Sequence, residues 1–260
     1  MKHIYAFENN LEYEKYKHIA ADLMERLTEY QKVLERNYSL TSMPKAIVWT
    51  TEELATSVFS TVAIPAYTSK DIIYITPDLD AWRKLFMEQL DGLDIPQVQH
   101  FFENYSENML FTILAHELTH HSDLFLDEFA DEREDSIWFE EGMCDYLARK
   151  TCLNKSEFLE IALIESELVE AFQDKYGDRT LDEFGIGSYQ GCLSRIMFDY
   201  WRSFLTVKFL VEEVASNNIM KIFEQYHNWD KEGRKVPLTT YFGIDSLNMK
   251  PIIDNIRITR

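Results

Sequence analysis

The most informative stretch of the chain reads Ile113-Leu114-Ala115-His116-Glu117-Leu118-Thr119-His120-His121. It contains His-Glu-x-x-His within a segment whose apolar spacing predicts a helix. Residues four apart lie on one helical face about one turn from each other, so His116 and His120 can both reach a single metal ion. Glu117 is rotated by roughly 100° around the helix, which suits a base that touches a metal-bound water rather than the metal. The stretch therefore predicts a metal site with a base beside it.

A second stretch supplies a third candidate ligand, and it reads Trp138-Phe139-Glu140-Glu141-Gly142-Met143-Cys144-Asp145. A catalytic zinc takes three protein ligands and leaves one position for water. Glu141 and Asp145 are four apart, so on a helix Glu141 can bind the metal while Asp145 accepts the N–H of a ligand histidine. Two histidines at this spacing also occur in ordinary helices, and the third ligand favours the metal site over that interpretation. A purely structural zinc site fits poorly, because such sites are closed by four ligands and are usually rich in cysteine.

The combined pattern resembles the gluzincin zinc metallopeptidases, the group of thermolysin and the M1 aminopeptidases. It consists of His-Glu-x-x-His, twenty further residues, a glutamate within Trp-x-x-Glu-Gly, and an aspartate four residues later. The resemblance implies that His116, His120 and Glu141 are ligands of Zn²⁺. It also implies that Glu117 is the general base and that Asp145 is the partner of a ligand histidine.

A third stretch, from Tyr200 to Leu210, is similar to an M1 segment that opens with a tyrosine and continues as a helix rich in Phe and Leu. In that group the tyrosine hydroxyl stabilises the oxyanion of the tetrahedral intermediate, so the resemblance implies this role for Tyr200, with Tyr189 as the alternative. A core tyrosine at a helix start is the other interpretation. The resemblance covers residues 106–226. The chain lacks Gly-x-Met-Glu-Asn, which binds the substrate's amino terminus in M1 aminopeptidases, so exopeptidase and endopeptidase activity both stay open.

Charge and composition restrict the class of protein. Of the 260 residues, 46% are hydrophobic and 14% aromatic, which is enough for a real core. The excess of 45 Asp and Glu over 26 Lys and Arg gives a formal net charge of −19, which disfavours nucleic-acid and membrane partners. It would favour basic or neutral substrates if part of it lines the cleft, and the alternative is that it only keeps the protein soluble. The three cysteines lack the spacing of a small disulfide framework, and the sequence shows neither a signal peptide nor an apolar span of about 18 residues. We therefore expect a cytoplasmic protein.

The apolar spacing also predicts the main elements. An amphipathic helix is expected over residues 11–36 and a largely helical chain after residue 154, with helices over 155–176, about 190–215 and 217–227. Three β-prone runs lie between, at residues 46–50, 61–67 and 72–75. Pro65 cannot donate a ladder hydrogen bond, so the second run is expected at a sheet edge. In gluzincins an edge strand binds the substrate backbone, which the resemblance implies for 61–67, although an ordinary edge strand is the alternative. The acidic run 127–135 is expected to be a solvated connection.

These patterns predict an α+β fold. We expect a small mixed sheet with helices, zincin-like by resemblance, followed by a mainly helical C-terminal lobe, with the zinc site in the cleft between them. Residues 1–260 are interpreted as a single metallopeptidase-like unit, with an α/β part over 1–105 and a zinc-binding and helical part over 106–260.

The resemblance implies a zinc-dependent peptidase that hydrolyses peptide bonds with a Glu-activated, zinc-bound water and acts on a peptide or protein. The alternative is a catalytically silent zinc-binding protein, regulatory or scaffolding, with a metallopeptidase fold. The sequence leaves the substrate and the oligomeric state open.

Overall fold

The structure, a computed structural model, describes residues 1–69, 71–127, 135–244 and 248–258. Most of the acidic run 127–135 lies outside these residues, so its interpretation as a connection is not addressed. Within the described ranges, no helix combines the length and the apolar character needed to cross a membrane.

The chain divides into two compact units, which are described one at a time. The first comprises Met1–Ala130 and Leu147–Leu153, and the second comprises Asp131–Tyr146 and Asn154–Arg260. Helix α5 (Ile137–Cys152) contributes residues to both units.

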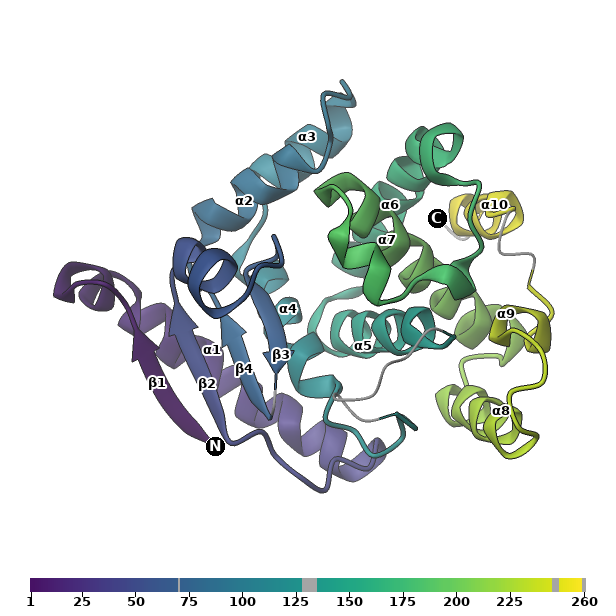
Figure 1. The fold of residues 1–260 in the computed structure, drawn as a ribbon, viewed down its shortest axis with the longest axis horizontal. Coiled ribbons are helices and arrows are strands. Elements are labelled where there is room, and N and C mark those ends of the chain that lie inside the picture. Colours follow the sequence, from purple (N-terminus) through teal and green to yellow (C-terminus); the bar gives the residue numbers. More distant parts are fainter. Residues whose placement is uncertain (70, 128–134, 245–247, 259–260) are drawn as a thin grey trace. The chain divides into compact units, whose positions relative to one another are not determined.

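The first unit contains a small mixed sheet, as the sequence predicted. Within the described residues it has four strands in the order β1-β2-β4-β3, namely β1 (Lys2–Ala6), β2 (Ala46–Thr50), β3 (Ala66–Ser69) and β4 (Ile72–Ile75) (Figure 1). The strands β1, β2 and β4 are parallel, and β3 is antiparallel to β4. Because β2 lies between two parallel neighbours, its residues are buried along its whole length.

Strand β3 differs from the prediction in its bounds, and strand β1 was not predicted. The expected strand 61–67 is wrong in extent, because the observed strand begins only at Ala66. Pro65 has no N–H to donate, and its carbonyl instead accepts from the amide of Thr76 at 3.0 Å. The edge position expected from Pro65 is confirmed, since β3 ends the sheet. Strand β1 was not predicted, because four of its five residues are exposed and give no alternating apolar pattern.

Helices complete the first unit. They are α1 (Asn10–Asn37), the π-helix η1 (Leu54–Phe59), α2 (Leu79–Glu88), α3 (Pro96–Glu103) and α4 (Glu107–Thr119). The predicted opening helix is confirmed as α1, which begins after an N-cap, Asn9, whose side chain accepts from two backbone amides. Helix α1 packs against α4, where the hydroxyls of Tyr30 and Thr119 form a buried hydrogen bond of 2.7 Å. The helix with the two histidines is therefore anchored to the longest helix of its unit.

The second unit is helical in its described residues, as expected. Besides the first part of α5 it contains α6 (Lys155–Tyr176), η2 (Leu181–Glu183), η3 (Ile186–Gln190), α7 (Leu193–Phe209), η4 (Leu210–Val214), α8 (Ile219–Lys231), α9 (Leu238–Tyr241) and α10 (Lys250–Ile258). Helix α6 has the predicted bounds, because Asn154 and Glu157 form a reciprocal capping box at its start.

A glycine sets how closely α5 approaches α7 in this unit. A Cβ atom added to Gly142 would collide with the backbone carbonyl of Ser203 and would lie 2.8 Å from Cγ2 of Val207. Only a residue without a side chain fits there. The glycine that follows Glu141 in the sequence is thus explained by helix packing.

We expect Gly142→Ala to lower the free energy of unfolding by about 1–3 kcal/mol, because the new methyl group overpacks the contact with α7. This loss should exceed the gain in helix propensity that alanine brings. The measurement is urea denaturation followed by circular dichroism. The matched control is Gly187→Ala, where an added Cβ meets no atom within 4 Å. Equal stability of the two variants would contradict this account of Gly142.

Candidate metal centre

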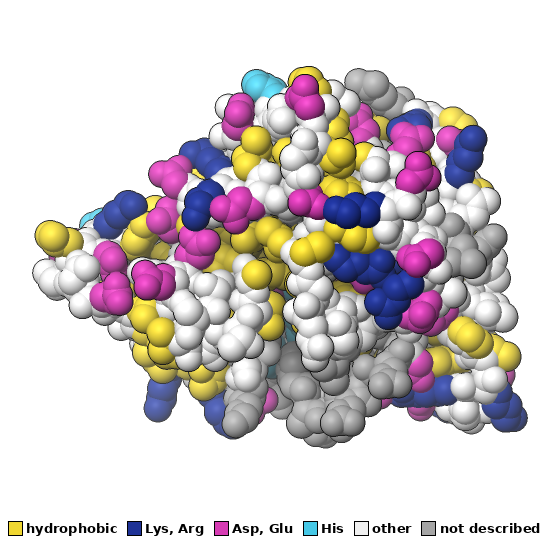
Figure 2. Space-filling view, turned by 45° about the horizontal axis from the view of Figure 1, so that its top comes forward, with side chains coloured by type: hydrophobic (Ala, Val, Ile, Leu, Met, Phe, Trp, Pro, Cys, Tyr) yellow, Lys and Arg dark blue, Asp and Glu magenta, His cyan; other side chains and the backbone are white. Residues whose placement is uncertain are grey.

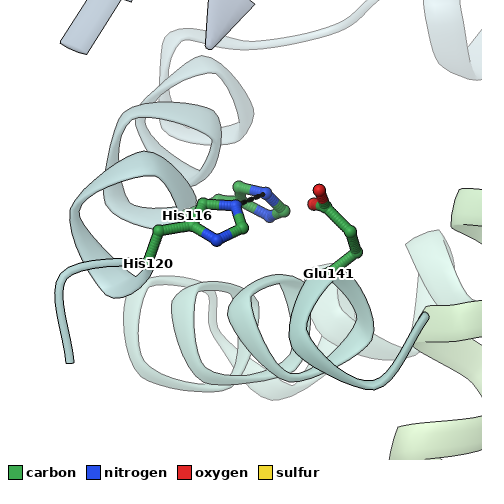
Figure 3. Close-up of side chains that lie close together, drawn as sticks. All are labelled: His116, His120 and Glu141. Carbon is green, nitrogen blue, oxygen red and sulfur yellow. Dashed lines mark hydrogen bonds between the residues drawn. The ribbon is translucent and has the colours of Figure 1, made fainter. Parts of the chain in front are cut away.

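The structure brings the three predicted ligands together. His116, His120 and Glu141 each offer one ligand atom, and these atoms all lie within 4.8 Å of one another. Figure 3 shows the two imidazole rings and the carboxylate directed toward a common point. His116 and Glu141 are only 7% and 9% exposed, and His120 is half-buried. Among the described residues, these three form a group that can hold a metal ion.

The end of α4 keeps the two histidines in register. The helix ends at Thr119, but His120 at the C-cap retains helical backbone angles, and its amide donates to the carbonyl of His116. The two Nε2 atoms are 3.0 Å apart. A metal held at about 2.0–2.1 Å from two nitrogens in a tetrahedral site would separate them by roughly 3.3 Å, so the observed spacing needs little adjustment. Two imidazoles and one carboxylate suit zinc and other divalent transition metals.

A tyrosine orients the carboxylate of Glu141. The hydroxyl of Tyr189, in η3, donates to Oε1 of Glu141 at 3.1 Å, and it also lies 3.0 Å from the hydroxyl of Tyr200 in α7. The ring of Phe184 packs against both tyrosine rings. Tyr189, one of the two tyrosines considered for the oxyanion role, thus contacts the candidate ligand Glu141 directly.

Arg202, two residues after Tyr200, has a structural role in the second unit. Arg202 is 1% exposed, and its guanidinium donates to Oδ1 of Asp199 at 2.6 Å and to the carbonyl of Arg179 at 2.9 Å. Burial lowers the pKa of Arg202, and the attraction of Asp199 opposes this shift. Arg202 is thus accounted for by an ion pair inside the helical unit.

The candidate base lies beside the ligands on α4. Glu117 is 6% exposed, and Oε2 of its carboxylate accepts a hydrogen bond of 2.8 Å from the hydroxyl of Thr68 in β3. Thr68 was not predicted as a site residue, because the predicted strand stopped at Tyr67. A strand placed one residue further along would have put Thr68 beside the helix that carries the motif.

Two further residues near the motif lie outside the group of three. His121 is half-buried, and burial, with a smaller effect of His120, lowers its pKa to about 4, so it is neutral at pH 7. Asp145 lies one turn after Glu141 on α5 and is half-buried. Its predicted role as acceptor for a ligand histidine stays a prediction.

No protein-family model matches this chain, and no curated protein or solved structure matches it. The resemblance to gluzincins therefore rests on the motif residues and on the group formed by His116, His120 and Glu141.

Metal binding is expected to depend on this group. Wild-type protein loaded with zinc and then desalted should retain about one ion per chain, whereas His116→Ala, which leaves two ligands, should retain a small fraction of that. Elemental analysis measures both. The control is His100→Ala, because His100 is exposed on α3. Equal zinc in all three proteins would show that the ion binds elsewhere.

Proposed function

We propose that this chain is a gluzincin-like zinc peptidase that hydrolyses peptide bonds. The observation that carries the proposal is the group of His116, His120 and Glu141 together with a second glutamate, Glu117, which follows His116 on the buried helix α4. A structural metal site has no need of a carboxylate at that position. A hydrolytic site needs one as a base.

The roles follow from the chemistry of the side chains. His116, His120 and Glu141 would hold the zinc, which when bound supplies a water of lowered pKa and polarises the substrate carbonyl. Glu117 accepts the proton of the attacking water and returns it to the leaving amine. Tyr200, or Tyr189, donates a hydrogen bond to the oxyanion of the tetrahedral intermediate.

The substrate is a peptide or protein in this proposal. The net charge of −19 favours basic or neutral chains over nucleic acids and anionic membrane surfaces. Asp and Glu side chains are spread over the face of the molecule that Figure 2 shows, rather than gathered in one patch. The proposal also includes a cytoplasmic location, on the basis of an odd number of cysteines that are free in the structure.

Glu117→Gln is expected to keep its zinc and to lower kcat by about 10²–10⁴-fold, because the amide cannot accept the proton. The measurement is cleavage of a mixed library of quenched fluorogenic peptides, beside elemental analysis of the same samples. Glu107→Gln is the control, since Glu107 is an exposed glutamate in the first turn of the same helix. A Glu117→Gln variant with wild-type turnover would refute the role of Glu117. Zinc without cleavage in the wild type would support the alternative of a silent zinc-binding protein.

The two tyrosines can be separated by experiment. We expect Tyr200→Phe to lower kcat by about 100-fold with metal affinity retained, as for the loss of one oxyanion donor. Tyr189→Phe removes the hydrogen bond to Glu141 and should weaken metal affinity by about 10-fold. Turnover and zinc competition with a chelator measure the two effects, with Tyr241→Phe as a control because its hydroxyl bonds to Glu232. The opposite pattern would assign the oxyanion contact to Tyr189.

A further inference from the structure

We propose that Thr68 is a positioning residue that holds the carboxylate of Glu117 in the orientation needed for proton transfer. This inference rests on the proposed function. Its basis is the hydrogen bond of 2.8 Å from Oγ1 of Thr68 to Oε2 of Glu117, which joins the edge strand β3 to helix α4. Both residues belong to the first unit.

The sheet places the hydroxyl of Thr68 on the face that meets α4. Thr68 is opposite Ile73 in the antiparallel pair of β3 and β4, and Ile73 is fully buried. Opposite residues of such a pair project from the same face, so Thr68 belongs to the packed face. On the other face, the rings of Tyr67 and Tyr74 stack at 5.0 Å. A polar side chain on a packed face needs a hydrogen-bond partner, and Glu117 provides it.

The same hydroxyl also reaches the main chain of Glu117. Oγ1 of Thr68 lies 3.4 Å from the carbonyl oxygen of Glu117, close to the end of α4. Thr68 therefore contacts both the backbone and the side chain of one residue. The hydroxyl has a single proton, so the contact of 2.8 Å with the carboxylate is the main hydrogen bond and the contact with the carbonyl is a weak second branch.

The carboxylate of Glu117 is buried, and this creates a physical need for the contact with Thr68. A carboxylate that is removed from water requires hydrogen-bond donors, and a bond to an ionised acceptor is stronger than one between neutral groups. Glutamate has several rotatable bonds, whereas the branched side chain of threonine is stiff at χ1. The hydroxyl of Thr68 thus supplies a fixed donor for a flexible acceptor. Catalysis is sensitive to small misplacements of the reacting groups, so this contact should affect turnover.

The test compares Thr68→Val, which keeps the shape but removes the hydroxyl, with Thr68→Ser, which keeps the hydroxyl. With the library peptide that the wild type cleaves fastest, Thr68→Val should lower kcat by about 10- to 100-fold and leave KM within about twofold. Thr68→Ser should restore kcat to within about threefold of the wild type. Zinc content should be equal in all of them, because Thr68 bonds to Glu117, which is not one of the three proposed ligands.

Thr50→Val is the matched control. Thr50 lies in the same sheet, and its hydroxyl donates to the carbonyl of Ala6 at 2.9 Å, so this variant loses a similar hydrogen bond away from Glu117. It should keep the wild-type kcat. The role of Thr68 would be overturned by any of three results. They are a wild-type kcat in Thr68→Val, a loss of kcat in Thr68→Ser equal to that in Thr68→Val, and an equal loss of kcat in Thr50→Val. If the zinc-loaded wild type cleaves no peptide, the proposed function fails, and the role of Thr68 fails with it.

Discussion

Burial of helix α4 on nearly all sides is the constraint on which the candidate site depends. Ten of its thirteen residues are buried, and they include polar side chains as well as apolar ones. Buried polar groups must find hydrogen-bond partners, since they have lost those that water offers. Thr119 meets Tyr30 of α1, and Glu117 meets Thr68 of β3. The helix that carries His116 and Glu117 is therefore held by hydrogen bonds to α1 and β3.

The two carboxylates of the site are distinguished by the groups that donate to them. Glu117 accepts from the hydroxyl of a strand residue, and Glu141 accepts from the phenol of Tyr189. Both side chains are buried, so these contacts, rather than solvent, decide which way each carboxylate points. In the proposed function, these two glutamates with the same intrinsic chemistry would take the separate roles of base and ligand.

Close packing of α5 against α7 fixes the part of α5 that carries Glu141. Gly142 lets α5 approach the backbone of α7 at Ser203, and α7 also carries Tyr200, which bonds to Tyr189. Within the second unit, Gly142, Tyr189, which donates to Glu141, and Tyr200, which contacts Tyr189, are parts of one packing arrangement. Asp199 and Arg202, on either side of Tyr200 in α7, form a buried ion pair.

The sequence by itself determined what local geometry controls. The spacing of His116 and His120, the bounds of α6, and the strands β2 and β4 follow from helix and strand periodicity and from capping residues. Only the tertiary structure decided that β3 starts after Pro65 and that Tyr189 contacts Glu141. It also paired Thr68 with Glu117. Residues 48 and 49 positions apart meet in these last two contacts, and such contacts depend on how whole elements pack, which no local pattern encodes.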